Sequence, residues 1–459
     1  MLIRLFKEVI SKLGIDKAVA YSSGSRVIAG FTGVISLFFI SVFLTGVEQG
    51  FYFTFGSIIA LQVFFELGLT GIITQFVAHE ASHLVIDESL KYQGDYKYKS
   101  RLSSLIHFCV KWYFLISVVV LFFLIIVGFS YFSKYGENLN ENVEWKTPWI
   151  LICIGTAIKL FQSPFTSVLT GLGFVKETSK IGFYQQIIIP VTTWIGLACG
   201  LKLYVISISY LLSVALWFFF VLYMKLDKVL IKQWRVKITE KVDYIKEIFP
   251  YQWKIALSWI SGYFIFQLFN PVLFATEGAI VAGQMGLTLQ VLNTISAFSM
   301  SWINTKVPLM SNYIAQGKYS QLDMIFNKTL KQMNFVSGIL LMFFLLFVLI
   351  LKLTKFSVGD NLLGERFLGL IPILLMMVPI YLQQYTNAWA TYLRCHKREP
   401  YLILSIVAGI MSLSSTFILG SKFGLYGITI GYFCIRLILF PWGYKIFTKY
   451  NKLWHNNYV

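Results

Sequence analysis

The stretch from Thr147 to Thr170, TPWILICIGTAIKLFQSPFTSVLT, is a continuous apolar run with one charged residue, Lys159, at its centre. An α-helix needs about 20 mostly apolar residues to cross a bilayer, and this run exceeds that length. A spanning β-strand would instead be about ten residues long, with polar and apolar residues in alternation. The stretch therefore predicts a transmembrane helix with a cation near the middle of its length.

Apolar runs of this kind recur through the chain, in which 57% of residues are hydrophobic and 13% are charged. The mean hydropathy of +0.69 is typical of a protein embedded in lipid. We therefore predict an all-α integral membrane protein with about 12 transmembrane helices. The other predicted spans are Gly24–Leu44, Phe51–Ile73, Leu105–Phe129, Ile181–Gly200, Leu203–Met224, Pro250–Ala275, Ala279–Ile303, Met333–Leu353, Phe367–Leu393, Tyr401–Gly420 and Phe423–Ile446.

Lysine and arginine are unevenly distributed among the segments that join these spans. With both termini in the cytoplasm, the inner segments hold 28 of the 39 basic residues and the outer loops hold 7. Cytoplasmic loops carry the excess of basic residues, so this division predicts that both ends of the chain are cytoplasmic. The net charge of +18 then reflects topology and attraction to anionic lipids, and we expect no nucleic-acid partner.

The longest charged interval divides the spans into two groups of six. It predicts a basic cytoplasmic linker at 225–249 between an N-terminal lobe at 24–224 and a C-terminal lobe at 250–446. Each lobe would begin and end in the cytoplasm, as in parallel internal repeats related by an axis along the membrane normal. We predict an amphipathic segment at 1–23 on the membrane surface and a cytoplasmic tail at 447–459.

One motif in the chain is typical of zinc enzymes. His79-Glu80-Ala81-Ser82-His83 matches HExxH, in which two histidines one helical turn apart bind zinc and the glutamate activates water. No third ligand stands at the required spacing, and no Asp lies inside a span, where an intramembrane protease would need one. The joining loops are also too short for a soluble catalytic domain. We therefore interpret the motif as a polar helix end, and we predict a protein that is not an enzyme and uses no metal or cofactor.

Two basic residues lie too deep in their spans to reach the lipid headgroups. Lys159 and Arg436 are about 12 residues from either end, roughly 18 Å at helical rise, whereas their side chains reach about 6 Å. Such a charge in lipid costs about 3 kcal/mol on insertion scales, which favours a hydrated cavity wall. A buried hydrogen bond to a neighbouring helix is the alternative. No Asp or Glu lies at comparable depth, so we predict an anionic substrate.

Uncharged polar residues recur at helical spacing within several spans. Lipid offers them no hydrogen-bond partners, so they must face protein or water. We predict that they line a cavity for sugar hydroxyls, with hydrogen bonding between helices as the alternative. These residues are Gln162 in the fourth span, Gln267 and Asn270 in the seventh, Gln290 and Asn293 in the eighth, and Gln384 and Asn387 in the tenth.

Four short stretches resemble a known transporter family. Phe65–Thr70 (FELGLT) and Gln75–Glu80 (QFVAHE) are similar to the end of the second helix in Wzx-type O-antigen and polysaccharide flippases, members of the multidrug/oligosaccharidyl-lipid/polysaccharide (MOP) exporter superfamily. Ala282–Thr288 (AGQMGLT) and Val307–Gly317 resemble that family's eighth helix and the loop that follows it. With the twelve predicted spans and the basic linker, the resemblance extends over essentially the whole chain.

The resemblance implies two six-helix lobes that form a V around a central cavity, as in MATE transporters and lipid flippases. It also implies a function. An undecaprenyl-diphosphate-linked oligosaccharide, the repeat unit of O-antigen or a related polysaccharide, would move from the inner to the outer leaflet of the bacterial inner membrane by alternating access through a cationic cavity. Membrane lipids and the polysaccharide polymerase machinery would be its partners.

By position, the resemblance implies roles for individual residues. Arg26 matches a basic cavity residue of the first helix, and it would join Lys159 and Arg436 in neutralising the diphosphate. Glu66, the only acidic residue inside a span, matches with Gly68 an acid-x-Gly pattern of the second helix. Glu66 is therefore the candidate for coupling transport to a proton or sodium gradient.

Other functions fit the chain less well. A multidrug exporter of the same fold needs acidic residues in the membrane to bind cationic drugs, and only Glu66 qualifies. A polyprenyl-dependent polysaccharide polymerase or ligase needs a large outer loop with catalytic residues, whereas the longest outer loop here contains neither His nor Arg. The lipid II flippase branch of the family has further helices and has basic residues in its second and eighth spans, so peptidoglycan precursor is a disfavoured cargo.

Overall fold

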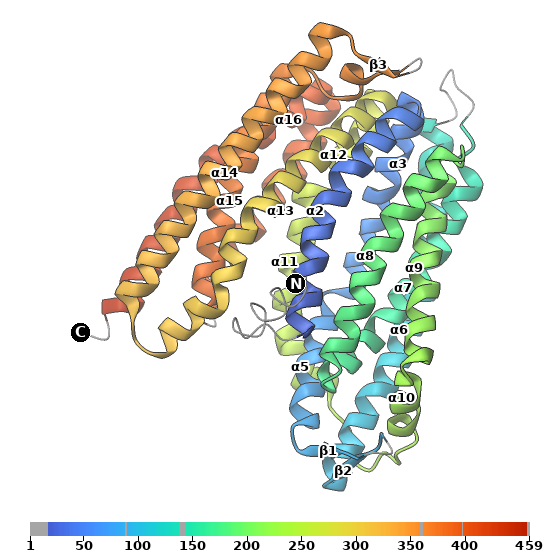
Figure 1. Ribbon diagram of the computed structural model, residues 1–459, viewed down its shortest axis with the longest axis vertical. Helices are drawn as coiled ribbons and strands as arrows, with labels where there is room; N and C mark the ends of the chain where they lie inside the picture. The colour runs from blue at the N-terminus through green and yellow to red at the C-terminus, as the bar shows by residue number, and fades with distance from the viewer. Residues whose placement is uncertain (1–16, 88–89, 137–142, 359–360, 397, 457–459) are drawn as a thin grey trace, which may run out of the picture. The chain divides into compact units, whose positions relative to one another are not determined.

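The computed structural model describes residues 17–87, 90–136, 143–358, 361–396 and 398–456, and helices form most of this part of the chain. Every predicted span falls on a helix or on a run of helices with a short break (Figure 1). Among the described residues, seven helices are long and apolar enough to cross a membrane, and one bent pair makes an eighth. The all-α prediction is confirmed. Most of the predicted amphipathic N-terminal segment lies outside the described residues.

Several helices of the first half extend past the predicted spans, most of all α6, which has 41 residues. A helix can continue out of the apolar layer because its backbone hydrogen bonds are internal. A small hairpin, β1 with β2, follows the second span. The elements are α2 (Lys17–Phe43), α3 (Gly46–Ile59), η1 (Ala60–Gln62), α4 (Val63–Glu66), α5 (Leu69–Ala81), β1 (Leu84–Ile86), β2 (Tyr92–Gly94), α6 (Tyr96–Gly136), α7 (Lys146–Gly171), α8 (Val175–Ala198), α9 (Tyr204–Tyr223) and α10 (Leu226–Trp234).

The second half ends in α16, in which the last two predicted spans are joined at a kink. The kink is at Gly424, whose φ of 53° and ψ of −132° interrupt the helix. The backbone N–H of Leu425 there donates to Glu277 Oε1 at 2.6 Å. The elements are η2 (Tyr244–Ile248), α11 (Phe249–Phe266), α12 (Phe269–Thr276), α13 (Ala279–Ala315), α14 (Tyr319–Thr354), β3 (Ser357–Val358), β4 (Asn361–Leu362), η3 (Leu363–Arg366), α15 (Leu370–Arg394) and α16 (Leu402–Asn456).

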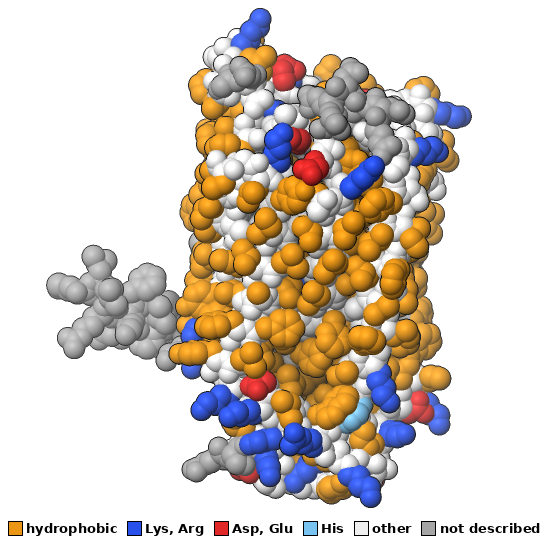
Figure 2. All heavy atoms as spheres, turned by 90° about the vertical axis from the view of Figure 1, so that its right-hand side faces the viewer, with side chains coloured by type: hydrophobic (Ala, Val, Ile, Leu, Met, Phe, Trp, Pro, Cys, Tyr) orange, Lys and Arg blue, Asp and Glu red, His pale blue; other side chains and the backbone are white. Residues whose placement is uncertain are grey.

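The surface of the molecule carries the polarity pattern expected of a protein in a bilayer. Figure 2 shows a face on which apolar side chains fill a broad middle zone, while Lys and Arg gather toward its two ends. Many large apolar residues are exposed, as they must be where lipid replaces water. The unusually exposed apolar surface is therefore consistent with a membrane setting.

The chain packs as two compact units. Unit 1 comprises Met1–Thr32, Leu61–Ser130 and Glu144–Ala256. Unit 2 comprises Gly33–Ala60, Tyr131–Val143 and Leu257–Val459. Two pieces of the first half, around α3 and the end of α6, thus pack with the second half. The division into lobes at 24–224 and 250–446 stays a prediction.

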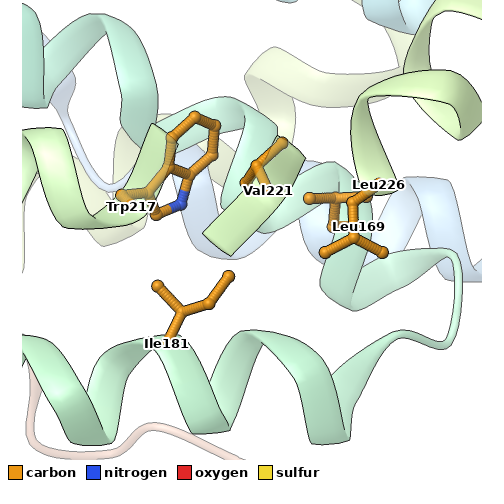
Figure 3. Packing of buried hydrophobic residues seen from close by; sticks show 5 residues of the cluster. All are labelled: Leu169, Ile181, Trp217, Val221 and Leu226. Carbon is orange, nitrogen blue, oxygen red and sulfur yellow. The ribbon is translucent and has the colours of Figure 1, made fainter. Parts of the chain in front are cut away.

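The core of unit 1 joins four helices at one end. Leu169 of α7, Ile181 of α8, Trp217 and Val221 of α9, and Leu226 of α10 form a buried apolar cluster (Figure 3). The indole N–H of Trp217 donates to the hydroxyl of Thr166 at 2.9 Å, which satisfies the one polar atom of this side chain. Because α10 buries Leu226 here, this helix of the predicted linker is a packed part of unit 1.

The rest of the predicted linker is bound along the beginning of α6. The hydroxyl of Ser100 accepts hydrogen bonds from the backbone N–H groups of Thr239 and Glu240, at 2.7 and 2.8 Å. Ser103 Oγ donates to the carbonyl of Val236 at 2.9 Å. Ser100 and Ser103 are both fully buried. The predicted linker is thus a folded strap rather than a free tether.

The HExxH segment has a structural explanation in unit 1. Glu80 is 2% exposed and accepts a hydrogen bond at 3.0 Å from Nε of Arg101, whose Nη2 donates to Glu247 at 2.6 Å. Burial alone would raise the pKa of Glu247, but hydrogen bonds from Arg101 and from the Asp243 backbone hold that pKa below its ordinary value. Among the described residues no group of three His, Cys, Asp or Glu is placed to hold a metal. Glu80 anchors Arg101.

Unit 2 contains a very close contact between α3 and α13. Gln49, only 1% exposed, donates from Nε2 to the carbonyl of Gly283 at 2.8 Å and to that of Arg366 at 3.2 Å. A Cβ atom added at Gly50 would lie 2.0 Å from the carbonyl oxygen of Ala279, and one at Gly283 would lie 2.8 Å from the Gly50 nitrogen. Glycine at both positions therefore allows the two backbones to touch.

The seventh predicted span is divided between two helices. Within Pro250–Ala275, α11 stops at Phe266 and α12 begins at Phe269. Pro271 stands in the first turn of α12, where the absent N–H would have no helical partner anyway. The proline therefore helps to start the second helix and does not mark the break itself.

Candidate functional site

Lys159 lies on α7, half-buried, with its side chain over an aromatic ring of the same unit. Its Nζ is 4.5 Å from the ring centroid of Tyr210 on α9. A cation over the face of an aromatic ring is attracted by the negative charge of that face. No ion pair to Lys159 occurs among the described residues. The alternative expected from the sequence, a hydrogen bond to a helix carbonyl, is not observed among them either.

The polar residues of α7 form two groups with different environments. Nearer one end of the helix, Thr166 accepts from Trp217 and Thr170 donates to the Thr166 carbonyl at 2.7 Å, so both are structural. Around Lys159 the situation differs. Thr156 is 1% exposed and Gln162 is 5% exposed, yet Thr156 Oγ1 and Gln162 Oε1 have no hydrogen-bond partner among the described residues. Buried polar atoms without partners are rare in proteins, and they mark this stretch as a candidate site.

The second predicted span breaks beside its acidic residue. Leu67 and Gly68 have φ values of 52° and 67°, and the helices on the two sides of this break are bent by 43°. Two consecutive left-handed residues cannot continue a helix, and glycine is the residue best suited to this conformation. Glu66, half-buried at the end of α4, accepts a hydrogen bond from Thr70 Oγ1 at 2.7 Å. The carboxylate thus lies where the backbone hydrogen bonding of the span is interrupted.

One residue near this break was missed by sequence reasoning. Tyr113, on α6, is fully buried, its hydroxyl has no partner among the described residues, and it interacts electrostatically with Glu66. A tyrosine within an apolar run gives a weak signal, because its ring is compatible with lipid or protein packing. Its depth in the third predicted span was the only indication that its hydroxyl would need a special environment.

Arg436 lies in unit 2, on the last part of α16, and is 7% exposed. Its Cζ is 5.2 Å from the ring centroid of Tyr432 one turn earlier. It lines a small cavity together with Gln383 and Thr386 of α15. Lys159 and Arg436 belong to different units. That these two cations meet one substrate stays a prediction. Arg26 falls in α2, and its side chain lies outside the described part of the structure.

The predicted polar lining residues have several environments. Asn270 donates from Nδ2 to Ser57 Oγ at 3.3 Å, which is the bonding between helices that was the alternative to a cavity. Asn387 accepts from Gln383 Nε2 at 2.7 Å, within one helix. Gln384 is fully buried and neither atom of its amide has a partner among the described residues. Three remain open to solvent or lipid to different degrees: Gln267 and Gln290 are half-buried, and Asn293 is exposed.

The order of long apolar helices defines an all-α membrane fold. Solved structures of MOP-superfamily transporters have this same fold. The predicted fold class, an all-α membrane fold like that of MATE transporters and lipid flippases, is therefore confirmed.

Three solved structures illustrate the similarity. An inward-facing MATE multidrug resistance transporter matches with a TM-score of 0.66 at 15% identity, covering 95% of this chain and 99% of its own. The lipid II flippase MurJ in an inward closed conformation matches with 0.58 at 13% identity, covering 94% and 89%. A MOP transporter from Pyrococcus furiosus matches with 0.52 at 13% identity, covering 94% and 95%. No family model and no curated protein matches the sequence.

Proposed function

We propose that this protein moves a lipid-linked oligosaccharide across the bacterial inner membrane, from the inner to the outer leaflet, by alternating access. The proposed substrate is an undecaprenyl-diphosphate-linked repeat unit of O-antigen or a related polysaccharide. Its membrane orientation would place both termini in the cytoplasm. The observation that carries this proposal is the environment of Lys159, a deep cation with an aromatic ring beside it and no carboxylate paired to it among the described residues.

The charge of this site favours an anion. A diphosphate carries negative charge that a cation in a medium of low dielectric constant attracts strongly, because little water screens the interaction. The amide oxygen of Gln162 and the hydroxyl of Thr156 lie within one turn of Lys159 and have no partner among the described residues. Both are buried in this structure, and alternating access would expose them to water or to sugar hydroxyls. A drug exporter for cations would need acidic groups instead. In the predicted spans only Glu66 is acidic.

The fold is compatible with either cargo. Among the structures of similar fold are a MATE multidrug transporter and a lipid II flippase. The transporter from Pyrococcus furiosus is described as having a binding pocket of reversed polarity that suggests a different function. The polarity of the binding pocket thus differs among proteins of this fold. The residues of this chain, rather than its fold, support the anionic lipid.

A direct test follows the leaflet on which the glycolipid accumulates. In a host from which the gene is deleted, we expect lipid-linked oligosaccharide to accumulate on the inner leaflet, protected in intact spheroplasts from an impermeant glycosidase. Expression of the wild-type protein should restore access to the enzyme. Accumulation on the outer leaflet would contradict the proposal and would favour a polymerase or ligase. Changed resistance to cationic drugs with normal surface polysaccharide would favour the multidrug exporter.

Glu66 is the proposed site of coupling to an ion gradient. It lies at a break in the second span, and in broken spans of transporters the interrupted backbone and nearby side chains bind coupling ions. In proteoliposomes, we expect Glu66→Gln to remove the dependence of glycolipid transport on an imposed proton or sodium gradient, while transport down the substrate gradient continues. Thr70→Val, which removes the hydroxyl hydrogen-bonded to Glu66 but keeps the carboxylate, is the matched control. A gradient dependence that survives in Glu66→Gln would exclude this role.

A further inference from the structure

The guanidinium of Arg436 is buried without a counter-charge. Only 7% of the residue is exposed, and its Nε and Nη2 have no hydrogen-bond partner among the described residues. The ring of Tyr432, 5.2 Å from Cζ, is the one interaction recorded for this group in the described structure. The Tyr432 hydroxyl is itself buried, and no group in the described part of the chain bonds to it. The guanidinium of Arg436 and the hydroxyl of Tyr432 are therefore both buried, and no hydrogen bond to either is observed among the described residues.

Such an arrangement is unfavourable unless something else occupies it. Arginine keeps its proton at every physiological pH, so it cannot reduce the cost of burial by becoming neutral. An uncompensated buried charge is among the most destabilising features that a folded protein can contain. The neighbouring residues of the described structure supply no carboxylate to these two nitrogens. The missing partner must therefore come from outside the described residues, and a bound ligand would supply it.

The cavity beside Arg436 limits the size of that partner. Gln383 and Thr386 of α15 line it with Arg436, and the remaining walls are apolar: Leu382, Leu404, Leu439 and Phe440. The cavity volume is about 10 Å³, close to the least that holds a single water molecule. A lipid diphosphate is several times larger than this. The geometry thus favours a monatomic ligand over the substrate proposed above.

We propose that unit 2 holds a binding site for a small monovalent anion of the chloride class, formed by the guanidinium of Arg436 with the Thr386 hydroxyl in an apolar enclosure. Arg436 supplies the charge and two N–H donors. The Thr386 hydroxyl donates to the Leu382 carbonyl at 3.4 Å in this structure, and by rotating it would supply a third donor to the anion. Water could bridge Arg436 to the unpaired Oε1 of Gln383, but water would leave the charge uncompensated. The site is independent of the glycan proposal, because it needs no substrate and lies wholly within one unit.

The test is thermal unfolding of the purified full-length protein in detergent, in mixtures of sodium chloride and sodium gluconate at constant ionic strength. Once chloride exceeds its half-saturating concentration, the unfolding midpoint should rise by about 2 °C for each tenfold increase in chloride. Arg436→Gln should remove this dependence. Crystals grown in bromide should show an anomalous scattering peak beside the guanidinium. A chloride response that is absent from the wild type, or equal in Arg436→Gln, would overturn the proposal.

Two further variants keep the result interpretable. If Arg436→Gln does not fold, Thr386→Val retains the cation and should raise the half-saturating chloride concentration by about tenfold, the cost of one hydrogen bond to a charged group. Lys159→Gln, in unit 1, should lose glycolipid transport but keep the chloride response. Failure of the glycan proposal and failure of the anion site would therefore be distinguished, because the first is measured by transport and the second without any substrate.

Discussion

Lys159→Ala is expected to lower glycolipid transport by at least about tenfold, because a charged hydrogen bond to phosphate contributes on the order of 1.5 to 3 kcal/mol. Lys159 is half-buried, and its Nζ lies over the Tyr210 ring, so alanine removes the only charge at this depth of α7. The measurement is the rate at which lipid-linked oligosaccharide becomes accessible to a glycosidase outside proteoliposomes, at equal protein content.

The neighbouring span offers a matched control. Lys111 on α6 is exposed and lies close enough to the predicted inner surface for its side chain to reach the headgroups, so Lys111→Ala should transport at the wild-type rate. Lys159→Arg should retain most activity because it keeps the charge. Tyr210→Leu keeps the lysine but loses the ring, and an intermediate rate is expected. Equal rates in Lys159→Ala and the wild type would show that this lysine only packs against the ring.

Gly50→Ala is expected to destabilise unit 2 by at least about 2 kcal/mol, although it adds only one methyl group. The new Cβ would lie 2.0 Å from the carbonyl oxygen of Ala279 on α13. Backbone atoms cannot move aside as a flexible side chain can, so α3 and α13 would have to separate and the bond from Gln49 to the Gly283 carbonyl would lengthen. The unfolding midpoint in detergent and the yield of monodisperse protein measure this effect.

The same helix contains the control. Gly56 is exposed on α3, and nothing lies within 4 Å of a Cβ built there. Gly56→Ala should change stability by no more than about 0.5 kcal/mol, or increase it slightly through the higher helix propensity of alanine. Gly283→Ala, whose Cβ would meet the Gly50 nitrogen at 2.8 Å, should be impaired like Gly50→Ala. If Gly50→Ala and Gly56→Ala unfolded at the same temperature, the close contact would not be a constraint.

The positions of the helices could be predicted from the sequence because backbone N–H and C=O groups find no hydrogen-bond partners in lipid. A single spanning segment can pair these groups internally only as a helix. Every apolar run of about 20 residues had to be helical, and each is. Helix ends and breaks were harder to predict. The break at Leu67–Gly68 has a glycine as its signal, whereas the one after Phe266 has no local signal, since the nearby Pro271 lies inside α12.

The candidate site was only partly predictable, because depth along a span and position around a helix carry different information. Counting residues identified Lys159 and Arg436 as cations too deep to reach headgroups. It could not indicate that Lys159 lies over Tyr210 or that Arg436 is enclosed in a cavity with Gln383, since these contacts join helices distant in sequence. Asn270 illustrates the same limit: its spacing suggested a cavity wall, and its amide bonds to Ser57.

The strap along α6 has a consequence for the order in which the protein is made. Ser100 accepts from the backbone of Thr239 and Glu240, residues 139 and 140 positions later in the chain. A ribosome that has just completed α9 has produced most of unit 1. It has not yet produced the backbone groups that form hydrogen bonds with Ser100 and Ser103. These buried hydroxyls must stay in water until residue 240 emerges. Unit 1 therefore cannot finish folding during synthesis until this charged segment has emerged, although its composition alone suggests a simple connection between the two halves of the chain.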